Sequence, residues 1–344
     1  MIDEGIQTQF PGAAGYLNTA SLGLPPQVAV DALSAALAEW QAGRAEAPGY
    51  DVHVSTARVA FAAMVSTPVE WVATGAQVSA LVGMAVTLLR PGARILCPEG
   101  EFTSVIFPLL ARDDLGLEVV TAPLERLADA VDPGIALVAF SVVQSADGRV
   151  ADLEAIRTAG AANGTLTLAD ATQAAGWLPI DATGFDVTVT GTYKWLLSPR
   201  GTAFMTVRPE LLDRIQPLYA GWYAGSEPWE SIYGLPLRLA SDASRLDLSP
   251  AWHAWVGTAA SLRLLNEVGI EQVHAHDVGL ANALRAKLGL EPSDSAMVSL
   301  DLGPDFDPSR LEGIKTAFRA GRLRVGFHLY NTEDDVERLL AAIL

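Results

Sequence analysis

Hydrophobic and polar positions alternate in blocks along the first two thirds of the chain. Short runs that are almost entirely apolar, as in buried strands, alternate with longer segments in which apolar residues recur with helical spacing. The predicted strands are residues 93–97, 117–120, 135–140, 166–169 and 187–190. The predicted helices are residues 77–89, 103–111, 153–163 and 171–176. Apolar strands separated by helices are typical of a mostly parallel sheet that is covered on both faces.

The pattern changes from about residue 235. Here the spacing predicts long helices, then short strands, then a last helix. These elements are residues 252–268, 270–288, 297–302, 323–327 and 332–344. We therefore expect an α/β protein with two domains: a large domain over residues 16–234, and a smaller α+β domain formed by residues 1–15 and 235–344.

Composition narrows the class of partner. Half of the 344 residues are hydrophobic and 18% are charged, so the chain can bury a large core. The formal net charge of −17 disfavours nucleic acids and anionic membrane surfaces as partners.

The single cysteine, Cys97, leaves no disulfide framework, which fits a reducing compartment. His274 and His276 lack companion ligands, so we expect no metal site. The first residues lack the features of a signal peptide, and no apolar stretch is long enough to span a bilayer. We expect a cytoplasmic protein without a membrane partner.

Candidate chemistry lies where strands end, because ligands of such sheets bind beyond the carboxyl ends of the strands. Lys194, one of only three lysines, follows a predicted buried strand and precedes Trp195 and two leucines. Burial there would lower the pKa of the ammonium group and suit it to form a Schiff base. A lysine at a strand end also often extends its head group to solvent, and this feature alone favours neither alternative.

Asp170 ends the strand at residues 166–169, where a carboxylate is costly without a cationic partner. In enzymes that use pyridoxal 5'-phosphate (PLP), a lysine holds the cofactor aldehyde and an aspartate keeps the pyridine nitrogen charged. Gln173 could then reach the ring hydroxyl. Asp170 can equally cap a helix that begins at Ala171, and the two roles are compatible.

A turn of small residues, Gly75, Ala76 and Gln77, leads into the predicted helix over residues 77–89. Backbone amides at a helix N-terminus bind phosphate well. The same kind of turn is also an ordinary helix start.

Four segments together resemble a known family: residues 16–20 (YLNTA), 168–173 (LADATQ), 192–201 (TYKWLLSPRG) and 323–333 (LRVGFHLYNTE). The chain resembles the class V aminotransferases among the fold-type I PLP-dependent enzymes, a group that includes cysteine desulfurases, kynureninases and isopenicillin N epimerase-like proteins. The resemblance implies a fold-type I PLP transferase and a homodimer with shared active sites. It also implies an α-amino-acid substrate that reacts through an external aldimine.

The resemblance also implies residue roles. Lys194 would be the Schiff-base lysine, Asp170 the partner of the pyridine nitrogen and Gln173 the contact to the ring oxygen. Phe102 falls where an aromatic side chain or a histidine stacks on the ring, although it can also be an ordinary core residue. The remaining cofactor contacts, mainly to the phosphate, would come from Gly75, Ala76, Gln77, Thr192, Tyr193 and, across the subunit interface, Ser249.

For the substrate, the resemblance implies Arg324 and Asn18. A guanidinium group grips a carboxylate through two parallel hydrogen bonds, and Arg324 lies in the segment that supplies this arginine. Arg319 and Arg322 lie close by and read as solvated surface charge.

Departures from the family pattern leave the substrate open. Gly191 stands where a phosphate-binding serine is usual, residues 141–145 (SVVQS) lack an expected asparagine, and the smaller domain is short. The nominal activity is that of an aminotransferase. The alternatives are a PLP-dependent β-lyase, either kynureninase-like or C–S-cleaving, and an amino-acid epimerase. No cysteine follows Cys97, so we expect no enzyme persulfide.

Two other classes of protein are disfavoured. A non-catalytic protein that keeps this fold does not need Lys194, Asp170 and Gln173 together. A nicotinamide-dependent enzyme would show a G-x-G-x-x-G turn after an early strand, and none occurs.

Overall fold

The apolar runs form the inner strands of a seven-stranded sheet in the computed structural model, which describes residues 2 and 4–344. The strand order is β1-β7-β6-β5-β4-β2-β3. Strands β2 to β6 pair in parallel, and β7 runs antiparallel to both β6 and β1. The strands are β1 (Val72–Gly75), β2 (Arg94–Pro98), β3 (Glu118–Ala122), β4 (Ile135–Ser141), β5 (Leu166–Asp170), β6 (Val187–Gly191) and β7 (Ala203–Val207).

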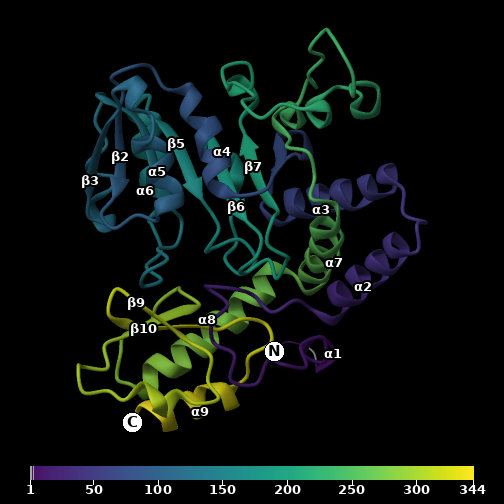
Figure 1. The fold of residues 1–344 in the computed structure, drawn as a ribbon. Coiled ribbons are helices and arrows are strands. Elements are labelled where there is room, and N and C mark those ends of the chain that lie inside the picture. The colour runs from purple at the N-terminus through teal and green to yellow at the C-terminus, as the bar shows by residue number, and fades with distance from the viewer. Residues whose placement is uncertain (1, 3) are drawn as a thin grey trace.

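Helices cover both faces of this sheet because the inner strands are apolar on both faces (Figure 1). Along β4, Leu137 and Ala139 belong to one hydrophobic cluster, whereas Val138 and Phe140 belong to another. The first cluster contains α4 (Val78–Ala85) and α5 (Thr103–Leu110). The second contains α3, α6 and α7. These three helices are Asp51–Met64, Leu153–Asn163 and Trp252–Val268.

The helix α7 packs mainly on α3 and on α2 (Gln27–Gln41), which belong to the first part of the chain. Figure 1 shows these three helices side by side next to the large sheet. The domain boundary near residue 235 stays a prediction.

A second, three-stranded sheet lies below the first in Figure 1 and has the order β8-β10-β9. Its antiparallel strands are β8 (Met297–Leu300), β9 (Ala317–Arg319) and β10 (Arg322–Gly326). The helices α8 (Ile270–Lys287) and α9 (Glu333–Ile343) pack with it. A short helix, α1 (Glu4–Gln7), precedes an N-terminal segment in which Asn18 bridges to Gly326 of β10.

The predicted helix over residues 171–176 is wrong, because this segment is a series of turns. Gly176 has φ 108°, and a Cβ atom on it would lie 2.4 Å from the carbonyl oxygen of Trp195. The close approach of the Trp195 segment therefore selects tight turns over a helix. The helices α2 and α3 and the strands β7 and β9 were not predicted from the pattern. Among the residues described, no helix has both the length and the apolar character that crossing a membrane requires.

Candidate active site

A cavity lies at the carboxyl ends of β4, β5 and β6. Seven of the residues predicted for the site line it: Ala76, Gln77, Phe102, Asp170, Gln173, Tyr193 and Lys194. The other lining residues are Val78, Ser79, Ser104, Ser141, Ser145, Thr172, Gly191, Arg200 and Thr202. Gly75, Thr192, Ser249, Asn18 and Arg324 do not line this cavity.

Lys194 is enclosed and does not extend to solvent, since 5% of it is exposed. Burial lowers the pKa of its ammonium group to about 8; the nearby Asp170 carboxylate opposes this shift, and the positive charge of Arg324 adds to it. Its Nζ atom lies 5.2 Å from the centre of the Phe102 ring. A Cβ atom on Gly23 would lie 1.9 Å from the carbonyl oxygen of Lys194, so only glycine allows this packing.

Asp170 is the last residue of β5 and is 4% exposed. Its Oδ1 atom accepts a hydrogen bond of 2.8 Å from the backbone amide of Thr172. Burial raises the pKa of this carboxyl group to about 6, against the opposing effects of Thr172 and Lys194. Within the described part of the chain, Asp170 forms no ion pair with an arginine. No helix begins at Ala171, so the alternative role as a helix cap is wrong.

Both the oxygen and the nitrogen of the Gln173 side-chain amide form hydrogen bonds within the protein. Its Oε1 atom accepts a hydrogen bond of 2.7 Å from Trp195 Nε1. Its Nε2 atom donates to the carbonyl oxygen of Ala20 and to Ser145 Oγ, at 3.0 Å each. A bond from Gln173 to a ring oxygen would therefore have to replace one of these contacts.

The N-terminus of α4 lines the same cavity. Gln77 is its N-cap and makes no side-chain capping bond, so the first-turn amides are not capped by a side chain. Ala76, Gln77, Val78 and Ser79 all line the cavity. Gly75 lies behind them, where a Cβ atom would meet Leu81 Cδ2 at 2.7 Å. These amides suit an anionic group such as a phosphate.

Within segment 192–201, the residues that line the cavity differ from those that the sequence analysis predicts. Tyr193 lines the cavity, and Arg200 stacks on it with Cζ 5.0 Å from the ring centre. Thr192 is fully buried instead and bonds to Thr202 Oγ1 at 2.6 Å. The sequence analysis missed Arg200 and Thr202, although both lie within eight residues of Lys194. Their closeness to Lys194 along the chain could have identified them as candidate site residues.

Arg324 is buried, 2% exposed, without a carboxylate partner in the described residues. Its Nη1 atom donates to the carbonyl oxygen of Ser145, and its Nη2 atom donates to Ser21 Oγ at 2.7 Å. The Nε atom is buried and has no partner. Burial, with a smaller effect of Arg319, lowers the pKa of the guanidinium group to about 10. Arg319 is exposed, as expected for a surface charge, and also contacts Ser21 Oγ at 3.4 Å.

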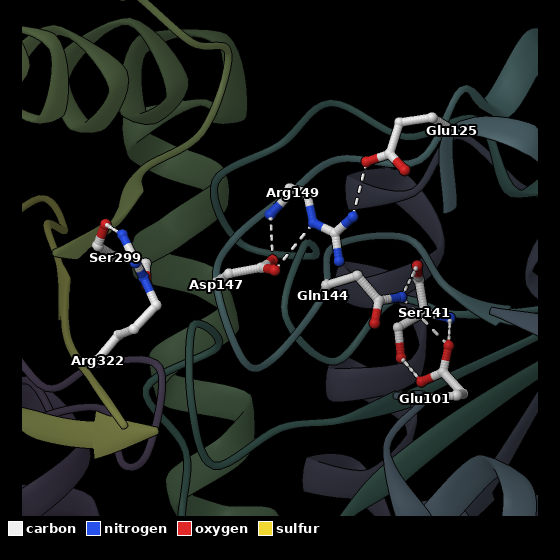
Figure 2. Close-up of polar contacts among 8 residues, drawn as sticks. All are labelled: Glu101, Glu125, Ser141, Gln144, Asp147, Arg149, Ser299 and Arg322. Atoms are coloured by element: carbon white, nitrogen blue, oxygen red, sulfur yellow. Dashed lines mark hydrogen bonds and ion pairs between the residues drawn. The ribbon is translucent and has the colours of Figure 1, made fainter. Parts of the chain in front are cut away.

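Arg322 lies on the same strand but points elsewhere. It donates hydrogen bonds to the side chain and backbone of Ser299 (Figure 2). It also pairs with Asp301 at 3.5 Å. Asn18, near the other side of β10, has a buried Oδ1 atom without a partner.

Glu101 is a buried carboxylate that the sequence analysis did not single out. It accepts hydrogen bonds from Ser141 Oγ at 2.5 Å and from Gln144 Nε2 at 3.2 Å (Figure 2). It also accepts one from the backbone amide of Phe102 at 2.6 Å. These bonds fix two residues of the cavity wall, Phe102 and Ser141. Phe102 is 40% exposed, so the alternative of an ordinary core phenylalanine is wrong.

Ser249 lies in the loop that precedes α7, outside the cavity lining. The adjacent Leu248 donates its amide to the carbonyl oxygen of Thr74 at 3.0 Å. The loop thus lies against the end of β1, next to the turn that leads into α4. Its predicted contact with a neighbouring subunit stays a prediction.

Comparison with known proteins agrees with this geometry. The sequence model of the family described as "Aminotransferase class-V" matches residues 28–300. The chain belongs to the class-V aminotransferase family. It is 27% identical to the uncharacterized aminotransferase YcbU of Bacillus subtilis, over 83% of this chain and 82% of that protein. It is also 27% identical to isopenicillin N epimerase of Streptomyces clavuligerus, over 76% of each chain.

Solved structures of class-V proteins share the fold. The cystine C–S lyase C-DES, in complex with cysteine persulfide, superposes with a TM-score of 0.86 at 22% identity, covering 97% of this chain and 99% of that one. A cysteine desulfurase from Thermococcus onnurineus NA1 gives a TM-score of 0.85 at 18% identity, covering 99% and 96%. The predicted fold-type I architecture, with its smaller C-terminal sheet, is confirmed.

The family uses PLP, and a C-DES structure holds glycine covalently linked to that cofactor. The residues of this chain fit the same group. A lysine with a lowered pKa faces a buried aspartate that lacks an arginine partner, and an uncapped helix N-terminus lines the same cavity. This class-V protein is therefore a PLP-dependent enzyme, as predicted.

Proposed function

We propose that this enzyme is an aminotransferase that acts on an α-amino acid, with Lys194 as the residue that carries PLP. The observation that carries the proposal is the enclosure of Lys194 beside Asp170 in one cavity. When bound, PLP supplies a sink for the electron pair that is released at the substrate Cα. We choose aminotransferase activity because it is the reaction after which the family is named.

Lys194 would hold the cofactor through its side-chain nitrogen, and its amine would serve as a base when it is not bonded to the cofactor. Because the pKa of Lys194 is lowered to about 8, a sizeable fraction of the freed amine is neutral near pH 7 to 8. A neutral amine can take the proton from Cα and return it elsewhere. Asp170 would keep a positive charge on the ring nitrogen, and the ring of Phe102 would cover one face of the site.

Arg324 would orient the substrate by its α-carboxylate. The bonds to Ser145 and Ser21 leave Nε and one hydrogen of Nη2 unused. In a planar guanidinium group, Nε and Nη2 lie along one edge, and their N–H groups can form the fork that a carboxylate accepts. A buried arginine without an acidic partner supports this role, since a buried charge is costly when it stays unpaired. The same role for Asn18 stays a prediction.

Two measurements test the proposed function. Borohydride should trap PLP on Lys194 in the wild-type protein, and Lys194→Ala should keep its fold but lose the trapped cofactor. Incubation with a panel of amino acids should then yield a keto acid and the amine form of the cofactor. Trapped cofactor in Lys194→Ala would remove Lys194 from this role.

The same panel distinguishes the alternatives. Release of ammonia with pyruvate, or of alanine, would assign a β-lyase, and inversion at Cα would assign an epimerase. Cys97 is fully buried, and burial raises the pKa of its thiol to about 12. We therefore expect any sulfur that leaves a substrate to appear as free thiol or sulfide.

A homodimer is also part of the proposal. Residues 216–240 project from the large lobe as a mostly irregular loop (Figure 1). Three of its apolar side chains are strongly exposed, with Tyr233, Leu235 and Leu237 at 87%, 93% and 72%. A second copy of the chain would bury this loop and bring Ser249 to a shared active site. Sedimentation should give a dimer, and a fully active monomer would contradict the shared site. The cytoplasmic location stays a prediction.

A further inference from the structure

A buried histidine–aspartate pair lies beside the lysine segment. His328 follows β10, Asp277 belongs to α8, and both side chains are 0% exposed. The His328 Nδ1 atom lies 2.8 Å from Asp277 Oδ2. The His328 Nε2 atom lies 2.9 Å from the carbonyl oxygen of Trp195, the residue after Lys194. The pair thus links the smaller sheet and α8 to the segment that carries the lysine.

The two contacts of the His328 ring determine which of its nitrogen atoms must carry a hydrogen. A carbonyl oxygen only accepts, so Nε2 must carry a hydrogen. Nδ1 then either donates to the Asp277 carboxylate or accepts from the protonated acid, and in both cases the pair shares one proton and is neutral overall. Burial raises the pKa of Asp277 to about 6, while His328 opposes this shift. Asp277 therefore holds the imidazole in the form that donates to Trp195.

Trp195 is held from several sides and transmits this constraint. Its indole packs on Gly326, where a Cβ atom would lie 3.1 Å from Cη2. Its Nε1 atom holds Gln173, and its carbonyl oxygen lies against Gly176. The peptide after Lys194 therefore has little freedom once the bond from His328 is made.

We propose that Asp277 and His328 position Lys194: His328 Nε2 anchors the carbonyl oxygen of Trp195, and Asp277 keeps the imidazole oriented to donate there. The lysine side chain then enters the cavity in one direction. This inference rests on the proposed role of Lys194 in carrying PLP. Neither residue touches the cavity, so both act through the backbone.

Two amide variants separate the two contacts of His328. In His328→Gln, the amide nitrogen falls near the place of Nε2 and can still donate to Trp195. In His328→Asn, the shorter side chain reaches only toward Asp277. Both variants lose the imidazole, so both should lower the melting temperature to a similar degree. Asp277→Asn can donate to Nδ1 and keep the Nε2 hydrogen, so it serves as the conservative variant.

His274→Gln is the matched control. His274 lies on the same helix as Asp277 and pairs with Asp294 at 3.1 Å, and it stacks on Trp177. No hydrogen bond connects it to the backbone of the lysine segment in the described residues. This variant removes a histidine–aspartate pair that involves α8 but leaves the hydrogen bond from His328 to the Trp195 carbonyl oxygen in place.

We would measure kcat and KM, the melting temperature, the borohydride-trapped fraction, and the reactivity of Lys194 toward an amine-modifying reagent in the cofactor-free protein. His328→Asn should lower kcat about 10- to 100-fold, as expected for a misplaced catalytic group, with altered Lys194 reactivity and little change in KM. His328→Gln and Asp277→Asn should stay within about threefold of wild type, like the control.

Equal loss of kcat in His328→Gln and His328→Asn, in step with their melting temperatures, would overturn the inference and leave a structural pair. Unchanged kcat and Lys194 reactivity in His328→Asn would overturn it as well. If wild-type protein itself traps no cofactor on Lys194, the proposed function fails, and the reactivity of Lys194 in the cofactor-free variants still tests the positioning.

Discussion

Two aspartates, Asp170 and Asp247, are buried at the same edge of the seven-stranded sheet but have different partners. Asp247 accepts a hydrogen bond of 2.7 Å from the amide of Thr74 and forms an ion pair with Arg58. Asp170 accepts from the Thr172 amide, faces the cavity and has Lys194 as its nearby cation. A buried acid with its own arginine stabilises the fold, whereas one without such a partner can accept a cationic ligand.

The largest effect on turnover is expected when Asp170, the buried acid without an arginine partner, is replaced. Asp170→Asn should lower turnover about 100- to 1,000-fold, because the charge that stabilises the ring nitrogen is lost. The free energy of unfolding of the cofactor-free protein should stay the same or rise, since a buried charge disappears. Steady-state kinetics and denaturant unfolding measure both. Near-normal turnover would place Asp170 in the same structural class as Asp247.

Removing the partner of the other acid should have the opposite profile. Arg58→Met leaves Asp247 buried and uncompensated, which should cost roughly 3–5 kcal/mol of unfolding free energy. The double variant Arg58→Met with Asp247→Leu should recover part of that loss. Denaturant unfolding of the cofactor-free proteins checks the values. A loss below about 1 kcal/mol in Arg58→Met would break the comparison, because it is the size expected of an exposed pair.

The raised pKa of Asp170 should be visible in the way the free energy of unfolding depends on pH. The pKa of Asp170 is raised from 3.8 to about 6 in the folded state. Between these values the folded protein binds more protons than the unfolded chain, so its stability falls as pH rises from about 4 to 6. The contribution is about 3 kcal/mol at 1.36 kcal/mol per pKa unit. Unfolding of Asp170→Asn across this range should show a correspondingly smaller decline, and parallel curves would contradict the raised pKa.

The smallest effect is expected at Cys97, a buried residue on the same sheet, which neither lines the active-site cavity nor forms an ion pair among the described residues. Because its thiol stays protonated with a pKa of about 12, Cys97→Ser should leave turnover within about twofold. Mass spectrometry after incubation with sulfur amino acids should show no persulfide on Cys97. A substrate-dependent persulfide together with lost activity in Cys97→Ser would restore a desulfurase function.

Local sequence patterns were enough to predict the parallel strands of the main sheet and the candidate site at their carboxyl ends, although β7 was not predicted. The apolar runs that became β2, β4, β5 and β6 are buried strands. Asp170 and Lys194 follow β5 and β6, which pair in parallel, so their carboxyl ends meet at one edge. The sequence alone therefore predicted these two residues at one site, because short-range composition indicates buried strands and their alternation with helices indicates parallel pairing.

Contacts between distant segments were decided only by the tertiary structure. His328 and Trp195 are 133 positions apart, and Arg324 reaches Ser21 across 303 positions. The turns at residues 171–176 formed in place of a helix because Trp195 packs against Gly176. A periodic pattern reports which face of an element is buried, but it does not report which polar side chains packing brings within hydrogen-bond distance. The sequence by itself thus determined the parallel strands and the candidate site residues at their ends, whereas the partners that hold Arg324, Gln173 and the lysine segment were decided by the tertiary structure.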